Sequence, residues 1–202
     1  VEFFGLRIAI EPGVFVPRKR TEFLVREAIA PATSGATVLD LCCGCGAVGI
    51  AICSGSDGAD LSAADIDPAA VRNATRNFAV FGGRAYGGDL FDPLPDALRG
   101  RVDILTANVP YVPTEAIALL PPEARDFEPL VTLDGGADGL DVLRRVAGEA
   151  PLWLAPGGHL FFETGETQAL AASDIITASG LASRIVTSDQ FHSTVVVGTR
   201  RR

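Results

Sequence analysis

The sequence predicts an α/β fold, a Rossmann-like and mostly parallel sheet that is covered by helices on both faces. Apolar runs of strand length alternate regularly with helical patterns, and this alternation is typical of a parallel sheet. The composition fits one globular domain, since 48% of the 202 residues are hydrophobic and 21% are charged. The last two apolar runs are joined by the short, helix-free segment Ser188–Ser193. They must be antiparallel, because a parallel pair needs a long crossover.

The predicted elements follow one another along the chain in this order. A short β-hairpin is expected first, from Leu6–Ile10 and Val14–Val16 joined by the turn Glu11-Pro12-Gly13, within an entry segment of residues 1–20. Asp67 before Pro68 supplies an N-cap for one helix. The predicted strands are Thr37–Leu41, Leu61–Asp65, Arg84–Gly88, Val102–Ala107, His159–Glu163, Arg184–Thr187 and Thr194–Thr199. The predicted helices are Thr21–Ala30, Val48–Ser54, Pro68–Phe81, Leu140–Glu149 and Thr167–Ser179.

Charge and cysteine usage exclude several classes of protein. The 17 Lys and Arg against 25 Asp and Glu give a net charge of −8, which argues against binding to nucleic acid or to an anionic membrane surface. No apolar run approaches the ~18–20 residues of a membrane-spanning helix. The four cysteines all lie between Cys42 and Cys53, a spacing that fits neither a disulfide framework nor a zinc site. Such crowded thiols favour a reducing compartment, the cytoplasm.

The first chemistry-bearing segment runs from Val38 to Gly49, where a predicted strand passes through a turn of small residues into a helix. Small residues let the backbone approach a ligand closely. Asp65, which ends the next strand, lies 19 residues beyond Gly46, about the distance at which a carboxylate accepts from ribose hydroxyls. The pattern predicts a nucleoside-containing cofactor, with Asp65 as its ribose ligand.

The second segment is Asn108-Val109-Pro110-Tyr111-Val112-Pro113, directly after the buried strand Val102–Ala107. Asn108 therefore lies at the carboxyl end of a parallel strand, where ligands bind in open α/β sheets. An ordinary strand-ending turn explains the Asn and Pro, but it does not explain the adjacent Tyr111. No clear regular element is predicted from Tyr111 to Leu140, and a stretch of that length is usually functional.

These motifs together resemble the HemK/PrmC group of class I methyltransferases, the protein-glutamine methyltransferases that act on peptide chain release factors. Asn108–Tyr111 looks like the Asn-Pro-Pro-Tyr signature of amino methyltransferases that modify planar nitrogens, and a parallel sheet with an antiparallel last strand is the class I layout. Further blocks resemble the group in order over nearly the whole chain. They are Val14–Arg18 with Thr21-Glu22, Leu119–Glu123, Phe127–Pro129, Asp134–Gly136, Asp138–Asp141, and Glu163–Gly165 with Gln168.

The resemblance implies S-adenosylmethionine as cofactor, S-adenosylhomocysteine as product, and transfer of a methyl group to a glutamine side-chain amide. The implied cofactor-binding residues are Cys42, Cys43, Gly44, Cys45, Gly46, Asp65, Ile66, Asp89, Leu90 and Asn108. The implied catalytic residues, which would hold the substrate amide, are Asn108, Val109, Pro110 and Tyr111. The chain departs from the group at Cys42, Cys43 and Val109, and at Arg20, which takes a place that is often acidic.

The expected protein is a single catalytic domain over residues 1–202, without the N-terminal helical domain of the group. It is expected to be a monomer that acts on a release factor, without a metal, a membrane or nucleic acid as partner. Two alternatives stay open: a methyltransferase for the exocyclic amine of adenine, and an idle cofactor-binding relative. Glu163 is expected either to assist at the site or to cap nearby backbone. His159 and His192 are interpreted as structural or surface residues.

Overall fold

The protein is built around a seven-stranded sheet in the order β5-β4-β3-β6-β7-β9-β8, as seen in a computed structural model that describes residues 1–125 and 128–202. β9 is antiparallel to both neighbours, and all other neighbouring pairs are parallel. This confirms the predicted sheet. The strands are β1 (Glu2–Phe3), β2 (Leu6–Arg7), β3 (Thr37–Leu41), β4 (Asp60–Asp65), β5 (Arg84–Gly87), β6 (Val102–Ala107), β7 (Leu154–Thr164), β8 (Ala182–Ser188) and β9 (Ser193–Thr199).

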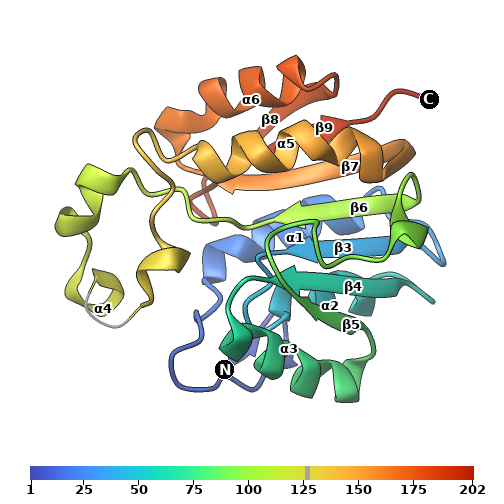
Figure 1. The fold of residues 1–202 in the computed structure, drawn as a ribbon, viewed down its shortest axis with the longest axis horizontal. Coiled ribbons are helices and arrows are strands. Elements are labelled where there is room, and N and C mark those ends of the chain that lie inside the picture. Colours follow the sequence, from blue (N-terminus) through green and yellow to red (C-terminus); the bar gives the residue numbers. More distant parts are fainter. Residues whose placement is uncertain (126–127) are drawn as a thin grey trace.

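Helices cover both faces of the sheet (Figure 1). α1, α2 and α3 pack on one face, and α5 and α6 pack on the other. The predicted cap of α3 is confirmed, since the Asp67 side chain accepts a hydrogen bond of 2.8 Å from the Ala69 amide. The helices are α1 (Glu22–Ile29), α2 (Ala47–Ser54), α3 (Pro68–Phe81), α4 (Pro122–Arg125), α5 (Asp141–Trp153) and α6 (Ala169–Ala178).

The core is divided between the two faces of the sheet by the alternation of side chains along each strand. In β3, Val38 belongs to the cluster under α1 and α2, whereas Leu39 and Leu41 belong to the cluster under α5 and α6. In β7, Phe161 and Phe162 divide in the same way, and both are fully buried. Strands that are apolar on both sides explain why the sequence reads as continuous apolar runs.

The N-terminal hairpin does not lie where the sequence predicts it. The hairpin joins Glu2–Phe3 to Leu6–Arg7, so it lies closer to the N-terminus than the predicted hairpin. Residues 14–16 form no strand. Phe4 and Gly5 both have positive φ, which is the conformation that a tight hairpin turn requires. The backbone that follows is paired differently: the Asn77 side chain bonds both the amide and the carbonyl of Ala9. Side chains of α3 thus take the place of the expected strand partner.

α5 and β7 extend beyond their predicted bounds because of tertiary packing. α5 continues past Glu149 to Trp153 despite Pro151, and the buried Trp153 ring stacks on Phe91 with centroids 5.3 Å apart. β7 begins at Leu154, paired with Val102, rather than at the predicted start. These contacts are between residues far apart in the sequence, so local periodicity does not reveal them.

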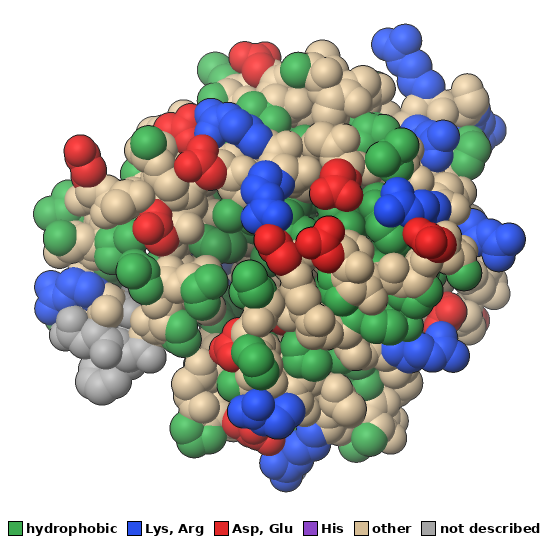
Figure 2. All heavy atoms as spheres, in the orientation of Figure 1, with side chains coloured by type: hydrophobic (Ala, Val, Ile, Leu, Met, Phe, Trp, Pro, Cys, Tyr) green, Lys and Arg blue, Asp and Glu red, His purple; other side chains and the backbone are tan. Residues whose placement is uncertain are grey.

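A lobe of residues 112–139 projects from the carboxyl ends of the strands, between β6 and α5 (Figure 1). No regular element was predicted there. The described residues of the lobe form short turns of helix, α4 and two 3₁₀ turns, Thr114–Leu119 and Leu130–Thr132, and one isolated β-bridge between Val112 and Asp134. Acidic and basic side chains are interspersed on the face shown in Figure 2. Within the described ranges, each helix is too short or too polar to serve as a membrane-spanning segment.

Candidate active site

A cavity of about 1080 Å³ lies where the carboxyl ends of β3, β4 and β6 meet the lobe. This volume exceeds the ~300–1,000 Å³ of ordinary small-molecule sites, so the cavity has room for a cofactor together with part of a substrate. Thirteen positions were predicted for the site, and Gly46 is the one that is absent from the cavity wall. The predicted residues that line it are Cys42, Cys43, Gly44, Cys45, Asp65, Ile66, Asp89, Leu90, Asn108, Val109, Pro110 and Tyr111.

The turn from β3 into α2 forms one wall of the cavity. Cys42 has φ +53°, a left-handed conformation that costs a non-glycine residue conformational energy. Gly46, also at positive φ, is the N-cap of α2, and a Cβ there would lie 2.5 Å from the Phe78 ring. Gly46 therefore allows the close packing of this turn on α3 and does not itself face the cavity.

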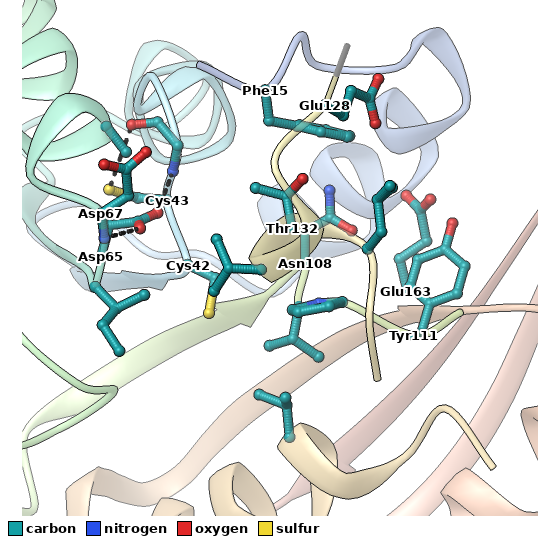
Figure 3. Close-up of a pocket in the computed structure, with 18 of the residues that line it drawn as sticks. Phe15, Cys42, Cys43, Asp65, Asp67, Asn108, Tyr111, Glu128, Thr132 and Glu163 are labelled. Atoms are coloured by element: carbon teal, nitrogen blue, oxygen red, sulfur yellow. Dashed lines mark hydrogen bonds between the residues drawn. The ribbon is translucent and has the colours of Figure 1, made fainter. Parts of the chain in front are cut away.

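Asp65 supports this turn from the end of β4. Its carboxylate accepts from the Gly44 amide at 2.8 Å and from the Asp67 amide at 2.9 Å (Figure 3). Burial raises the pKa of Asp65, although these backbone hydrogen bonds oppose the rise. A carboxylate has about four acceptor positions, so two bonds leave capacity for hydroxyl donors of a ligand. Whether Asp65 also binds ribose stays a prediction.

Asp40, which the sequence analysis did not single out, lies in the cavity wall beneath the turn. Its side chain is 1% exposed and accepts from the Thr106 hydroxyl at 2.8 Å and the Gly49 amide at 3.0 Å. Burial raises its pKa to about 7. The only sequence signal was an acid inside an apolar strand, which by itself indicates a paired buried group.

Asp89 and Leu90 form the far side of the predicted cofactor region. Leu90 has φ +46°, so the chain is strained on this side of the cavity as well. The Asp89 carboxylate accepts from Arg145 of α5 at 2.7 Å. Arg145 also lines the cavity, and no sequence pattern pointed to it.

Asn108 to Tyr111 line the cavity directly after β6. Asn108 lies between the Asp65 side and the Tyr111 side of the cavity (Figure 3). Its side chain makes no hydrogen bond to any residue that the structure describes, so its amide is available to a ligand. Val109 is buried in the core, whereas the Tyr111 carbonyl accepts from the Gln168 side chain at 3.0 Å. Core packing on one side and Gln168 on the other fix the backbone of this segment.

Glu163 lies at the end of β7 beside Tyr111 and is 2% exposed (Figure 3). The expectation that it caps nearby backbone is wrong: one of its oxygens pairs with Arg20 at 3.0 Å, and no backbone donor is bound to it in the described part of the chain. Arg20 also donates to the Tyr111 hydroxyl and lies over its ring. Burial raises the pKa of Glu163, and burial next to Glu163 raises the pKa of Tyr111 to about 12.

A second ion pair lies across the same end of the cavity. Arg18 donates to Glu128 of the lobe, and its guanidinium lies 5.2 Å from the centroid of the Phe15 ring. All three residues line the cavity. Only the family resemblance pointed to this region, and Phe127 of the resembling block lies outside the described residues.

The cysteine side chains do not close the cavity. Cys42, Cys43 and Cys45 line its wall, and the cavity volume of about 1080 Å³ already takes their sulfur atoms into account. All four cysteines are free thiols, and burial raises the pKa of each. They are therefore neutral, weakly reactive groups near neutral pH. His159 bonds Thr199 at 2.9 Å, and neither His159 nor His192 is in the cavity wall.

Comparisons with known proteins agree with this geometry. The model of the Methyltransferase small domain family matches residues 5–119. A release factor glutamine methyltransferase of Geobacter sulfurreducens is 37% identical over 98% of this chain and 70% of its own length. A 4-amino-L-phenylalanine/4-methylamino-L-phenylalanine methyltransferase of Streptomyces pristinaespiralis is 34% identical over 88% of this chain and 63% of its own length.

A solved methyltransferase structure from Pyrococcus furiosus shares the fold, with a TM-score of 0.73 over 98% of this chain and 91% of that chain at 15% identity. The chain spans 70%, 66% and 65% of the length of three release factor glutamine methyltransferases that it matches. Identity above 30% over almost all of this chain, on the same fold, shows common descent. The chain therefore belongs to the release factor glutamine methyltransferase family of S-adenosylmethionine-dependent enzymes.

Proposed function

We propose that this protein transfers a methyl group from S-adenosylmethionine to the side-chain amide nitrogen of a glutamine in a peptide chain release factor. The proposal rests chiefly on one observation: the Asn108–Tyr111 segment and the turn supported by Asp65 line the same cavity. We further propose that residues 1–202 form one catalytic domain, that the protein is monomeric, and that it works in the cytoplasm.

The chemistry of the cavity fits the cofactor. Asp40, Asp65 and Asp67 line one end, and an acidic surrounding suits the positive charge of a sulfonium. The turn with Cys42 and Gly44 would lie against the cofactor chain, Asp65 with Ile66 against the ribose, and Asp89 with Leu90 against the adenine. When bound, S-adenosylmethionine supplies an electrophilic methyl group.

Asn108 would solve the main difficulty of this reaction, which is that an amide nitrogen is a poor nucleophile. The nitrogen lone pair is delocalised into the carbonyl group. Acceptors directed at both N–H bonds would orient the amide and draw the lone pair toward the incoming carbon. The Asn108 side-chain oxygen and the Val109 carbonyl can serve as these acceptors, and a backbone carbonyl does not depend on the side chain at position 109.

Tyr111 would pack on the flat amide and hold it in line for transfer. Its hydroxyl is bonded to Arg20 and its pKa is raised to about 12, so it remains protonated and does not serve as a base at neutral pH. The nitrogen can lose its proton after transfer. Positioning of reacting groups at ~3–3.5 Å can lower a barrier by about 7–11 kcal/mol at best, so the mechanism needs no strong base.

Labelled S-adenosylmethionine and a release factor domain with a Gly-Gly-Gln sequence test this proposal. We expect methyl transfer to the glutamine, and we expect Asn108→Ala to lower kcat/KM about a hundredfold, because a misplaced amide loses the in-line geometry. Cofactor binding without transfer to any protein would instead identify an idle relative.

The Streptomyces relative supports a comparison with a second substrate, since its name describes a methylated aromatic amine. That amine, like an amide, is planar and conjugated. Transfer to 4-amino-L-phenylalanine but not to the release factor domain would overturn the assignment of a protein substrate. The same assay with both substrates therefore decides between them.

A further inference from the structure

Two arginines of the entry segment are anchored at the substrate end of the cavity in the same way. Arg18 pairs with Glu128, and Arg20 pairs with Glu163. The glutamate side chains are 11% and 2% exposed, whereas the arginine side chains are 39% and 47% exposed. Each pair thus has its acid inside the protein and its guanidinium at the cavity surface.

The arginines have donors left over after these contacts. A guanidinium carries five N–H groups. Arg20 uses its Nε for Glu163 and one Nη2 hydrogen for Tyr111, and Arg18 uses one Nη2 hydrogen for Glu128. No further hydrogen bond joins either guanidinium to a residue that the structure describes. Rigid N–H groups therefore line the cavity beside Tyr111, next to the proposed position of the substrate amide.

The charge of the buried glutamates determines which kind of acceptor the free N–H groups of the two arginines can bind. Each guanidinium is paired with one carboxylate, so a pair has no net charge and offers directional N–H groups rather than a positive field. A phosphate or carboxylate ligand needs uncompensated positive charge, whereas a peptide carbonyl needs only a well-placed donor. The net charge of −8 acts against an anionic ligand as well.

We propose that Arg18 and Arg20 bind main-chain carbonyl groups of the substrate on either side of the methylated glutamine. Glu128 and Glu163 are positioning residues that hold the two guanidinium groups. This inference rests on the proposed function and adds a determinant of substrate class: the site selects an amide that belongs to a polypeptide over one on a free small molecule or a nucleobase.

Lysine substitutions give the sharpest test, because lysine keeps the charge opposite each buried glutamate but lacks the planar fork. With the Gly-Gly-Gln domain as substrate, we expect Arg18→Lys to raise KM about tenfold and to leave kcat within about twofold. Arg20→Lys should raise KM similarly and also lower kcat, since Arg20 contacts Tyr111. The dissociation constant for S-adenosylmethionine should stay unchanged in both variants.

Arg184→Lys is the matched control, because Arg184 is 52% exposed, pairs with Glu27, and lies on β8 outside the cavity wall. It should leave KM unchanged. A second measurement needs no variant: a glutamine peptide with an alkene in place of one flanking amide bond lacks that carbonyl, and its KM with the unaltered protein should rise about tenfold.

The outcomes separate the two proposals. Unchanged KM in both lysine variants, with methyl transfer intact, would show that the ion pairs only fix the entry segment, and would overturn this inference alone. A KM that rises steeply with added salt would indicate an anionic ligand and would overturn it too. If the unaltered protein transfers no methyl group to the domain, the proposed function itself fails.

Discussion

Single residues in this protein show how burial changes the chemistry of an acid. Asp40 and Glu163 are both almost fully buried, and burial raises the pKa of each. Their partners differ: Asp40 is bonded to a hydroxyl and a backbone amide, whereas Glu163 is bonded to a guanidinium. Since the pKa of Asp40 is raised to about 7, its protonation state changes near neutral pH.

The protonation of Asp40 should make stability depend on pH. Its pKa is about 7 in the folded protein and near 3.8 in an unfolded chain, so between these values the folded state holds a proton that the unfolded state has lost. The free energy of unfolding should therefore decrease as pH rises from 3.8 to 7. Asp40→Asn should weaken this decrease, which urea unfolding at several pH values measures.

Asparagine is a suitable replacement because the site can satisfy it. Its oxygen can accept from the Gly49 amide while its NH₂ group donates to the Thr106 hydroxyl, which lies 3.5 Å from the Leu39 carbonyl as an alternative acceptor. Asp103→Asn provides a control, since Asp103 also bonds a backbone amide, that of Thr37, but is less buried. Equal pH slopes for Asp40→Asn and the unaltered protein would contradict the prediction.

At the scale of elements, the lobe and the 3₁₀ turn Glu166–Gln168 before α6 together determine where the Asn108–Tyr111 segment lies. The Val112 amide bonds the Leu133 carbonyl, and the Gln168 side chain bonds the carbonyls of Tyr111 and Asp138. Gly139 lies inside this set of contacts with φ +78°. A Cβ at Gly139 would collide with the Tyr111 carbonyl and the Gln168 amide.

Gly139→Ala should therefore lower the free energy of unfolding only modestly but lower the rate of methyl transfer strongly. The left-handed conformation costs an alanine about 1–2 kcal/mol, and displacement of Tyr111 should lower kcat/KM at least about tenfold. Gly180→Ala is the matched control: Gly180 has φ +93°, but a Cβ there meets nothing within 4 Å. Thermal unfolding and kcat/KM of both variants test this, and equal kcat/KM in the two would refute the displacement of Tyr111.

At the scale of the whole molecule, charge distribution separates a protein substrate from a nucleic acid. The chain carries a net charge of −8, and Figure 2 shows basic side chains interspersed with acidic ones on that face. The two arginines at the substrate end of the cavity are paired with acids. A phosphate backbone would find little uncompensated positive charge there.

Filter binding with single-stranded and duplex DNA and RNA should accordingly show no salt-dependent retention, and labelled S-adenosylmethionine should leave these polymers unmethylated. A basic DNA-binding domain retained under the same conditions would control for filter capture. Retention that falls as salt rises, together with methyl incorporation, would support the adenine-methylating alternative instead.

Most of the sheet could be predicted because its signals are local. The same holds for two parts of the candidate site, the expected cofactor-binding residues and the Asn108–Tyr111 segment. β3, β6 and α3 have the predicted bounds, since strands apolar on both faces and the Asp67-Pro68 start are visible in adjacent residues. The position of the first hairpin could not be predicted, because Asn77, far along the chain, takes the place of a strand partner for Ala9.

The sequence by itself determined the order of strands and helices along the chain and the turn of small residues after β3. It also determined that Asp65 and Asn108 lie at strand ends, because each of these features depends on neighbouring residues. The tertiary structure alone decided that Arg18 and Arg20 reach Glu128 and Glu163 across the cavity. These partners are separated by 110 and 143 positions, and only burial of the acids selects them. Long-range pairing of this kind leaves no periodic trace in the chain.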